Sequence, residues 1–160
     1  MSTAQFFAQR LKKEIPGFVK VIRALPEDKL DYKPHEKNTP AGALAWQMAC
    51  EMKSLPDVLD TGTVSYDGNE QCPALGEIAS TFEKAANEVV ERANAASDER
   101  WKGPAKFVYR GHVAWDSTVE EMAWGFLLDL IHHRGQLTAY LRPMGGKVPG
   151  VYGPSADDKP

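Results

Sequence analysis

Two pairs of polar residues, each separated by four positions, are the part of this sequence best suited to chemistry. Gln47 and Glu51 form one pair, and Asp129 and His133 form the other. Residues four apart in a helix project from the same face, so each pair would present its side chains together. Carboxylate oxygens and imidazole nitrogens are metal ligands. One interpretation is therefore a metal site in which Asp129 and His133 form a two-ligand clamp and Gln47 or Glu51 supplies the next ligand.

The same spacing has a second interpretation that needs no metal. Asp129 and His133 could form a buried hydrogen-bonded pair in which the carboxylate selects the imidazole tautomer, because buried polar networks also occur without a functional role. Glu51 could lie at the edge of its helical face and reach solvent. The spacing alone leaves both interpretations open. The other histidines and the two cysteines lie in predicted loops or beside the helical faces and are weaker candidates: His35, His112, His132, Cys50 and Cys72.

Four stretches of helical periodicity must position the polar pairs. The first spans residues 7–25 and is interrupted at Pro16-Gly17, which predicts a kink or a new helix start. The second begins near Thr39-Pro40 and runs to about residue 60, with Pro56 as a potential break. The third covers residues 75–97. The fourth begins at residue 116 or 117, where residues 117–120 fit a capping box, and ends before Arg142.

The first and third predicted helices carry no ionisable residue on their apolar faces, whereas the second and fourth carry the polar pairs. Burying such groups without partners is costly, so they should meet one another, water or a metal. Residues 101–115 are expected to form a loop or a small hairpin. The loop 62–73 and the irregular tail after Gly145 are expected to shape the mouth of a pocket. The sequence thus predicts an all-α, four-helix bundle with long crossing loops in one domain, residues 1–160.

The length, net charge and hydropathy of the chain exclude some classes of protein and partner. A chain of 160 residues can bury a substantial core as one domain. Its formal net charge is −3 and its sequence pI is near 5.8, which does not favour a nucleic-acid partner. No apolar run approaches the roughly 18 residues of a membrane span, and the N-terminus lacks the apolar segment of a signal peptide. We expect a cytoplasmic protein without nucleic-acid or membrane partners.

Three segments of the sequence resemble the DinB/YfiT-like superfamily. The first is residues 22–34, and the second is Ala43-Leu44-Ala45-Trp46-Gln47-Met48. The third contains His133-Arg134-Gly135-Gln136-Leu137, followed by Tyr140-Leu141-Arg142, Gly145 and Val148-Pro149. The His-Arg-Gly-Gln run followed by Tyr-Leu-Arg is fairly specific to that family. The resemblance covers nearly the whole chain and is least diagnostic over residues 62–116.

The resemblance implies a four-helix bundle, often dimeric, in which three histidines hold a divalent metal. One histidine comes from the second helix and two, four residues apart, come from the fourth. The matching positions here are Gln47, Asp129 and His133, so one of the three histidines is retained. Three imidazoles suit nickel or zinc, whereas an amide oxygen, a carboxylate and one imidazole form a harder, weaker set, which Glu51 could supplement. We expect nickel, zinc or manganese at an altered site, and a homodimer.

The resemblance also implies a class of reaction. Characterised relatives look like transferases and isomerases that use low-molecular-weight thiols, with open metal positions for a water or thiolate nucleophile. We expect a metal-dependent enzyme of the thiol-dependent transferase or hydrolase type, with Gln47, Asp129 and His133 as metal ligands and Glu51 as the catalytic base or a further ligand. Its partner would be a small-molecule substrate or a low-molecular-weight thiol. The alternative is a metal-free small-molecule-binding or stress-response module without catalysis. A third hypothesis is a dimeric scaffold in which the inward polar residues only set the helix register.

Overall fold

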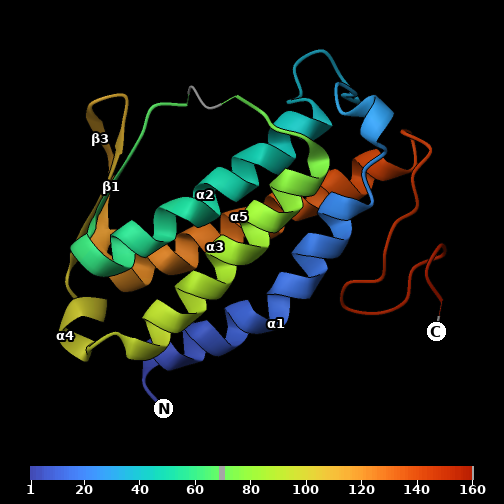
Figure 1. Ribbon diagram of the computed structural model, residues 1–160. Coiled ribbons are helices and arrows are strands. Elements are labelled where there is room, and N and C mark those ends of the chain that lie inside the picture. The colour runs from blue at the N-terminus through green and yellow to red at the C-terminus, as the bar shows by residue number, and fades with distance from the viewer. Residues whose placement is uncertain (69–70, 160) are drawn as a thin grey trace.

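The computed structural model describes residues 1–68 and 71–159, most of which are helical. Four long helices lie alongside one another (Figure 1): α1 (Thr3–Arg23), α2 (Ala41–Thr61), α3 (Leu75–Ala95) and α5 (Val119–Leu141). Two short helical segments lie in the connections: η1 (Glu27–Lys29) and α4 (Asp98–Trp101). None of the described helices is long and apolar enough to cross a membrane.

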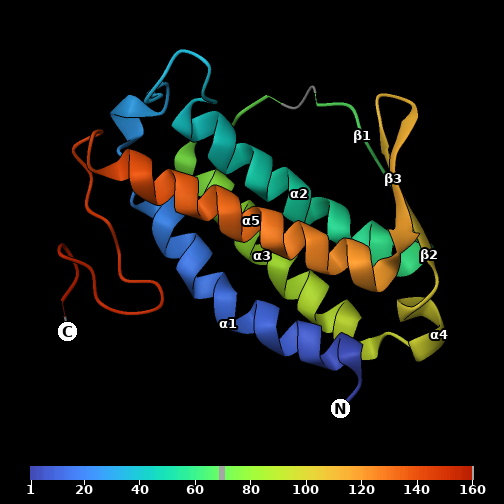
Figure 2. The same cartoon turned by 180° about the vertical axis from the view of Figure 1, so that it is seen from behind.

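The prediction of an all-α chain is only partly correct, because three strands form a small sheet at one end of the long helices (Figure 2): β1 (Thr63–Tyr66), β2 (Pro104–Tyr109) and β3 (His112–Thr118). Strands β2 and β3 form an antiparallel hairpin, and β1 pairs with β2 in parallel. The two hairpin-loop residues, Arg110 and Gly111, both have positive φ, at 49° and 79°. Such a loop matches the twist of the strands. Of the two structures considered for residues 101–115, the chain adopts the hairpin.

Neither internal proline ends its helix. Pro16 lies inside α1 and Pro56 lies inside α2, so the break considered at Pro56 does not occur and α1 is one helix. A proline removes one backbone N–H donor from a helix and is usually disruptive there. Each proline here is flanked by buried apolar residues, and their burial stabilises the continuous helix. These residues are Ile15 and Phe18 in α1, and Leu55 and Val58 in α2.

The N-termini of α2 and α5 differ from the predicted ones by about one residue. Pro40 is the N-cap of α2 rather than its first helical residue, and no side chain caps it. The N-cap of α5 is Thr118, whose hydroxyl accepts from the Glu121 N–H at 3.2 Å. The Glu121 carboxylate in turn accepts from the Thr118 N–H at 3.2 Å. This reciprocal pair is the predicted capping box, shifted by one position, because Glu121 rather than Glu120 lies three residues after the cap.

The apolar faces of the long helices meet in one core. Phe18 of α1 packs on Phe82 of α3, with ring centroids 4.9 Å apart. Phe7 packs on the fully buried Trp101 at 5.4 Å and edge-on against Trp124 at 5.2 Å. Trp124 therefore packs against the core. This core holds α5 beside α2, which is the relationship that the polar pairs require.

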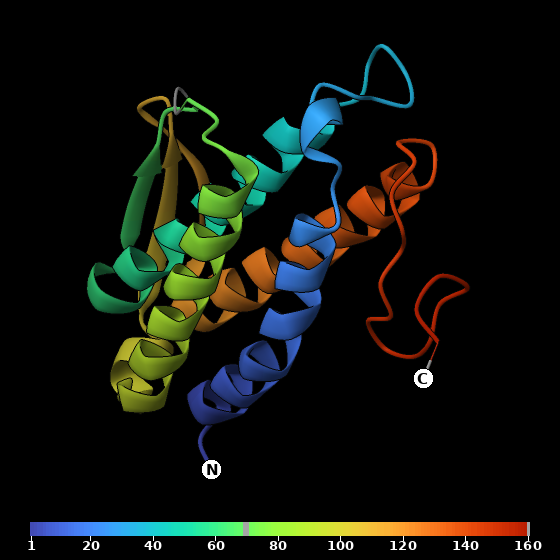
Figure 3. The same cartoon turned by 45° about the vertical axis from the view of Figure 1, so that its right-hand side comes forward.

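A buried ion pair corrects the expectation that the first helix buries no ionisable group. Glu14 of α1 is 5% exposed, and its carboxylate lies 2.8 Å from the guanidinium of Arg134 on α5, which is 3% exposed. The Tyr152 hydroxyl in the C-terminal tail donates to Glu14 at 2.8 Å. The Arg134 guanidinium also lies over the rings of Phe18 and Tyr152. The tail thus lies against α1, on the opposite side of the molecule from the sheet (Figure 3).

Candidate metal centre

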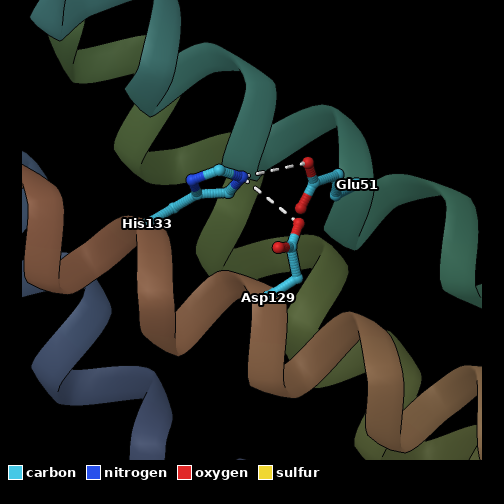
Figure 4. Close-up of side chains that lie close together, drawn as sticks. All are labelled: Glu51, Asp129 and His133. Atoms are coloured by element: carbon cyan, nitrogen blue, oxygen red, sulfur yellow. Dashed lines mark ion pairs between the residues drawn. The ribbon is translucent and has the colours of Figure 1, made fainter.

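The packing of α2 against α5 brings the two polar pairs of the sequence into one place. Gln47 and Glu51 lie one turn apart on α2, and Asp129 and His133 lie one turn apart on α5. Figure 4 shows the side chains of Glu51, Asp129 and His133 directed toward one another from the two helices. All four residues singled out in the sequence are therefore neighbours in the structure. Glu51, Asp129 and His133 are called the acid–His cluster below.

The distances within the acid–His cluster suit a shared cation. The Nε2 atom of His133 lies 3.2 Å from Oδ2 of Asp129 and 3.8 Å from Oε1 of Glu51. One ligand atom from each of the three residues lies within 4.8 Å of the other two. Gln47 joins the group through its amide nitrogen, which donates to Oε1 of Glu51 at 2.8 Å and lies 3.2 Å from Nε2 of His133. In this arrangement Gln47 presents a donor, not a metal ligand, to the cluster.

Gln136 determines which nitrogen of His133 faces the cluster. The Nδ1 atom of His133 lies 2.7 Å from Oε1 of Gln136, an amide oxygen that only accepts hydrogen bonds. Nδ1 therefore carries a proton, and Nε2 is the ring nitrogen that lies beside the two carboxylates, where it could bind a cation. Metal-binding histidines are commonly held by such a bond from the other ring nitrogen. Sequence reasoning did not assign this role to Gln136, although its position three residues after His133 on the same helical face is a usable signal.

Glu51 is the most buried charged member of the cluster. Its side chain is 15% exposed, and its Oε2 atom is buried with no hydrogen-bond partner in the described part of the chain. Burial raises the pKa of the Glu51 carboxyl, and the negative charge of Asp129 adds to the increase, whereas the hydrogen bond from Gln47 and the proximity of His133 oppose it. An orphaned carboxylate oxygen of this kind is stabilised by a proton or a cation.

Asp129 differs from the sequence expectation. It was expected on the buried face of its helix, but its side chain is 53% exposed and lies at the rim of the cluster. The reason is that α5 presents Leu130 to the core at the adjacent position, which is fully buried, and turns Asp129 toward the open side. The cluster is therefore accessible to solvent on the Asp129 side and enclosed on the Glu51 side.

The chemistry of this donor set fits a divalent metal ion. Three lone-pair donors converge, two of them carboxylates, so a dication would neutralise their combined charge of −2. One imidazole with two carboxylates is a harder ligand set than three imidazoles and suits manganese or zinc. The buried Oε2 atom of Glu51, which has no hydrogen-bond partner among the described residues, is available as a metal ligand. These residues fit the metal that the sequence resemblance implied.

A cavity of about 790 Å³ opens beside the cluster. Gln47, Glu51 and Asp129 line it on one side. Tyr66, Gly68 and Cys72 come from the region of the 62–73 loop, which therefore contributes to the cavity as expected. No described residue of the C-terminal tail lines this cavity, contrary to expectation. Gly150, Val151 and Tyr152 of the tail line a separate cavity of about 270 Å³ against α1. The sequence also gave no sign that the hairpin would contribute three aromatic residues to the larger cavity: Phe107, Tyr109 and Trp115.

The weaker sequence candidates stay outside the cluster. His132 is exposed on α5, His35 is exposed in a connecting segment, and Cys50 is buried in α2. His112 is exposed too, but it is the first residue of β3 rather than part of a loop as predicted. Cys72 lines the cavity, but burial raises the pKa of its thiol, which lowers the fraction of reactive thiolate.

Comparisons with known proteins find a sequence relative of this chain and structures with a similar fold. Its sequence is 23% identical over 163 residues to the uncharacterized protein YrdA of Bacillus subtilis (strain 168), covering 98% of this chain and 92% of that protein. Its fold is similar to the crystal structure of a DinB-like protein from Bacillus cereus ATCC 10987, with a TM-score of 0.73, 21% identity and coverage of 91% and 95%. A DinB-like protein from Bacillus subtilis, YjoA, gives a TM-score of 0.68, 17% identity and coverage of 87% and 91%.

The sequence model of the DinB family matches residues 1–159, essentially the full length of the chain. The fold similarity to two DinB-like structures agrees with this match, and so do the segments that carried the resemblance. The chain therefore belongs to the DinB family.

Proposed function

We propose that the protein is a divalent-metal-dependent enzyme that acts on a small molecule bound in the 790 Å³ cavity. The observation that carries this proposal is the convergence of Glu51, Asp129 and His133 around a point that one cation could occupy, with a buried carboxylate oxygen left unpartnered in the described chain. Such a convergence of lone pairs is unfavourable without a positive charge.

Two glutamines hold the side chains of the proposed metal centre in position. Gln136 holds Nδ1 of His133 so that Nε2 faces the carboxylates. Gln47 donates to Glu51 and restrains its carboxylate. A divalent metal held by Glu51, Asp129 and His133 would act as a Lewis acid toward an oxygen or sulfur atom of the substrate. Because Asp129 is half exposed at the cavity, substrate can approach from its side.

The reaction class that we propose is hydrolysis or transfer of a thiol to an electrophile. Both reactions need a Lewis acid beside a cavity that admits a small molecule. Glu51 is placed to receive the proton of an attacking water or thiol if it does not itself bind the metal, since its carboxylate borders the cavity and is held by Gln47. Assays with 4-nitrophenyl acetate, and with glutathione and 1-chloro-2,4-dinitrobenzene, separate the two reactions.

Metal analysis of untagged protein tests the proposal directly. Protein incubated with manganese, zinc or nickel and then desalted is expected to retain about one equivalent of at least one of these metals. Asp129→Ala and His133→Ala should each lose it. His132→Ala is the matched control, because His132 is adjacent on α5 but exposed and outside the cluster. Absence of stoichiometric metal from the wild-type protein under all three conditions contradicts the proposal.

A metal-free binding module is the second candidate. The observation that favours it is the amide of Gln47, which donates to Glu51 and lies within hydrogen-bond distance of His133 and so satisfies part of the cluster without a cation. On this candidate, small molecules but not metals would raise the melting temperature. The homodimer expected from the family resemblance stays a prediction, which light scattering on the purified protein can check.

A further inference from the structure

The cavity beside the acid–His cluster is unusually rich in aromatic side chains. Six of its lining residues are aromatic, and they come from two helices and all three strands: Trp46, Tyr66, Phe107, Tyr109, Trp115 and Phe126. Aromatic rings contribute large, flat apolar surfaces that favour contact with other rings in offset or edge-on geometry. A cavity built from them favours a flat apolar ligand over a strongly hydrated one.

Three of these rings form a continuous surface, which we call the aromatic wall: Phe107, Trp115 and Phe126. Phe107 of β2 packs edge-on against Phe126 of α5, with centroids 5.7 Å apart and planes at 75°. Trp115 of β3 lies 6.2 Å from the same Phe126 ring at 32°. The hairpin and α5 thus hold the wall from both sides. Tyr66 and Tyr109, 6.3 Å apart, add a second ring pair to the cavity lining.

The charged residues in the cavity lining disfavour one class of ligand. Among the described residues that line it, the only charged side chains are Glu51 and Asp129, and both are acidic. Among the described residues the lining holds no lysine or arginine. Two cations lie over lining rings instead, with Nζ of Lys53 5.6 Å from the Trp46 centroid and Cζ of Arg110 5.1 Å from the Tyr109 centroid. In the metal-free cavity the two carboxylates therefore disfavour an anion beside the cluster.

Trp115 reaches its place in the wall because residue 125 is glycine. A Cβ atom at Gly125 would collide with Cη2 of Trp115 and lie 3.0 Å from Cζ3 and 3.2 Å from Cζ2. The indole therefore rests directly on the backbone of α5, one turn before Asp129. Any side chain at position 125 would move the indole, and the width of the cavity next to the cluster depends on where the indole lies.

We propose that the substrate is an uncharged compound with a planar aromatic ring, bound against the aromatic wall, and that the contact of Trp115 with Gly125 sets the specificity of the cavity. This inference rests on the proposed function for the role of its ligand as substrate. The ring selectivity itself depends only on residues of the wall, so it can be tested separately from metal binding.

Three probes of similar size test the ligand class in EDTA-treated, full-length protein by calorimetry: 2-naphthalenemethanol, its saturated analogue decahydro-2-naphthalenemethanol, and 2-naphthoate. We expect 2-naphthalenemethanol to bind about tenfold more tightly than the saturated alcohol, because it gains contacts with at least two rings. It should also bind at least about tenfold more tightly than the anion. Equal affinities for the planar and saturated alcohols, or tighter binding of naphthoate, would overturn the proposal.

A pair of glycine substitutions on α5 tests the role of the Trp115 contact. Gly125→Ala is expected to weaken binding of 2-naphthalenemethanol about tenfold, because the indole must move. Gly135→Ala is the control, since a Cβ there meets no described atom within 4 Å, and its affinity should match that of the wild type. Equal affinities for the two variants would contradict the specificity role.

A second measurement, on the wild-type protein, does not depend on whether Gly125→Ala folds. The indole N–H signal of Trp115, identified by its loss in Trp115→Phe, should shift in the NMR spectrum of the wild-type protein when 2-naphthalenemethanol is added. The indole signal of Trp101, which is fully buried in the core, should not shift. An unchanged Trp115 signal at saturating probe rejects the wall as the binding surface. If the wild-type protein retains no metal but still prefers the planar ring, the proposed function is rejected and the ring selectivity stands.

Discussion

Gln136 accepts a hydrogen bond from Nδ1 of His133 at a distance of 2.7 Å, and this contact directs Nε2 of the imidazole toward Glu51 and Asp129. The two residues lie three positions apart on α5, so the helix itself enforces their proximity. The contact makes the ligand properties of His133 depend on a residue that never touches the cation site.

The first prediction concerns this contact. Gln136→Ala should lower manganese or zinc affinity by about 10- to 100-fold, because the imidazole loses the partner that orients it and selects its tautomer. Gln136→Glu keeps an acceptor at the same place and should retain most of the affinity. Competition with a coloured chelator measures both variants. An unchanged affinity in Gln136→Ala would show that the tautomer is set elsewhere.

The second prediction follows from the raised pKa of Glu51 in metal-free protein. A carboxyl whose pKa is higher in the folded state stabilises the fold fully below its ordinary value of 4.5, and this contribution is lost as pH rises through the raised pKa. The free energy of unfolding of the wild type should therefore fall relative to that of Glu51→Gln as pH rises from 4.5. Urea unfolding in EDTA at a series of pH values measures this.

Glu91→Gln provides the control for this experiment, because Glu91 is exposed on α3. Its pH profile should run parallel to that of the wild type. If the profile of Glu51→Gln is also parallel, then burial does not shift the titration of Glu51.

The third prediction concerns metal preference. Replacing Gln47 and Asp129 together by histidine would place three imidazoles at the positions that the family resemblance implies. Imidazole ligands favour nickel and zinc over manganese. We expect the ratio of nickel to manganese affinity to rise by at least about tenfold in the double variant. Leu128→His adds one imidazole at an exposed position next to Asp129 and should leave the ratio unchanged.

The fourth prediction concerns the buried ion pair on the other side of the molecule. Arg134→Ala leaves the Glu14 carboxylate buried without its cation and should lower the free energy of unfolding by about 3–5 kcal/mol. Tyr152→Phe removes only a hydroxyl from the same group and should cost about 1 kcal/mol. Arg142→Ala breaks an exposed pair with Asp157 and should lower the free energy of unfolding much less than Arg134→Ala. Equal losses in Arg134→Ala and Arg142→Ala would contradict the buried pair.

Local periodicity accounts for what the sequence predicted well. The four long helices follow from apolar residues at three- and four-residue spacings, and the two polar pairs follow from a single interval of four. Because α2 and α5 each had a polar interruption of an otherwise apolar face, their meeting could be expected before the structure was known. The positions of Gln47, Glu51, Asp129 and His133 in one cluster agree with that expectation.

The features that were missed depend on contacts between distant segments. Strand β1 has four residues, and its parallel partner β2 lies far along the chain, with Thr63 opposite Lys106. No local pattern specifies such a pairing. The contact of Trp115 with Gly125 depends in the same way on where the hairpin folds. Glu14 was missed because a carboxylate on an apolar helix is usually at its edge, and its partner lies on another helix.

The proposed metal ligands and three of the aromatic residues of the cavity lie on different elements of the fold. The prospective metal ligands lie on α2 and α5, whereas Phe107, Tyr109 and Trp115 lie in the hairpin of residues 104–118. An exchange of residues 104–117 leaves Thr118, the N-cap of α5, and the ligand-bearing helices in place, provided that position 125 stays glycine. Selectivity could therefore be transferred between family members by grafting residues 104–117 while the same reactive centre is kept.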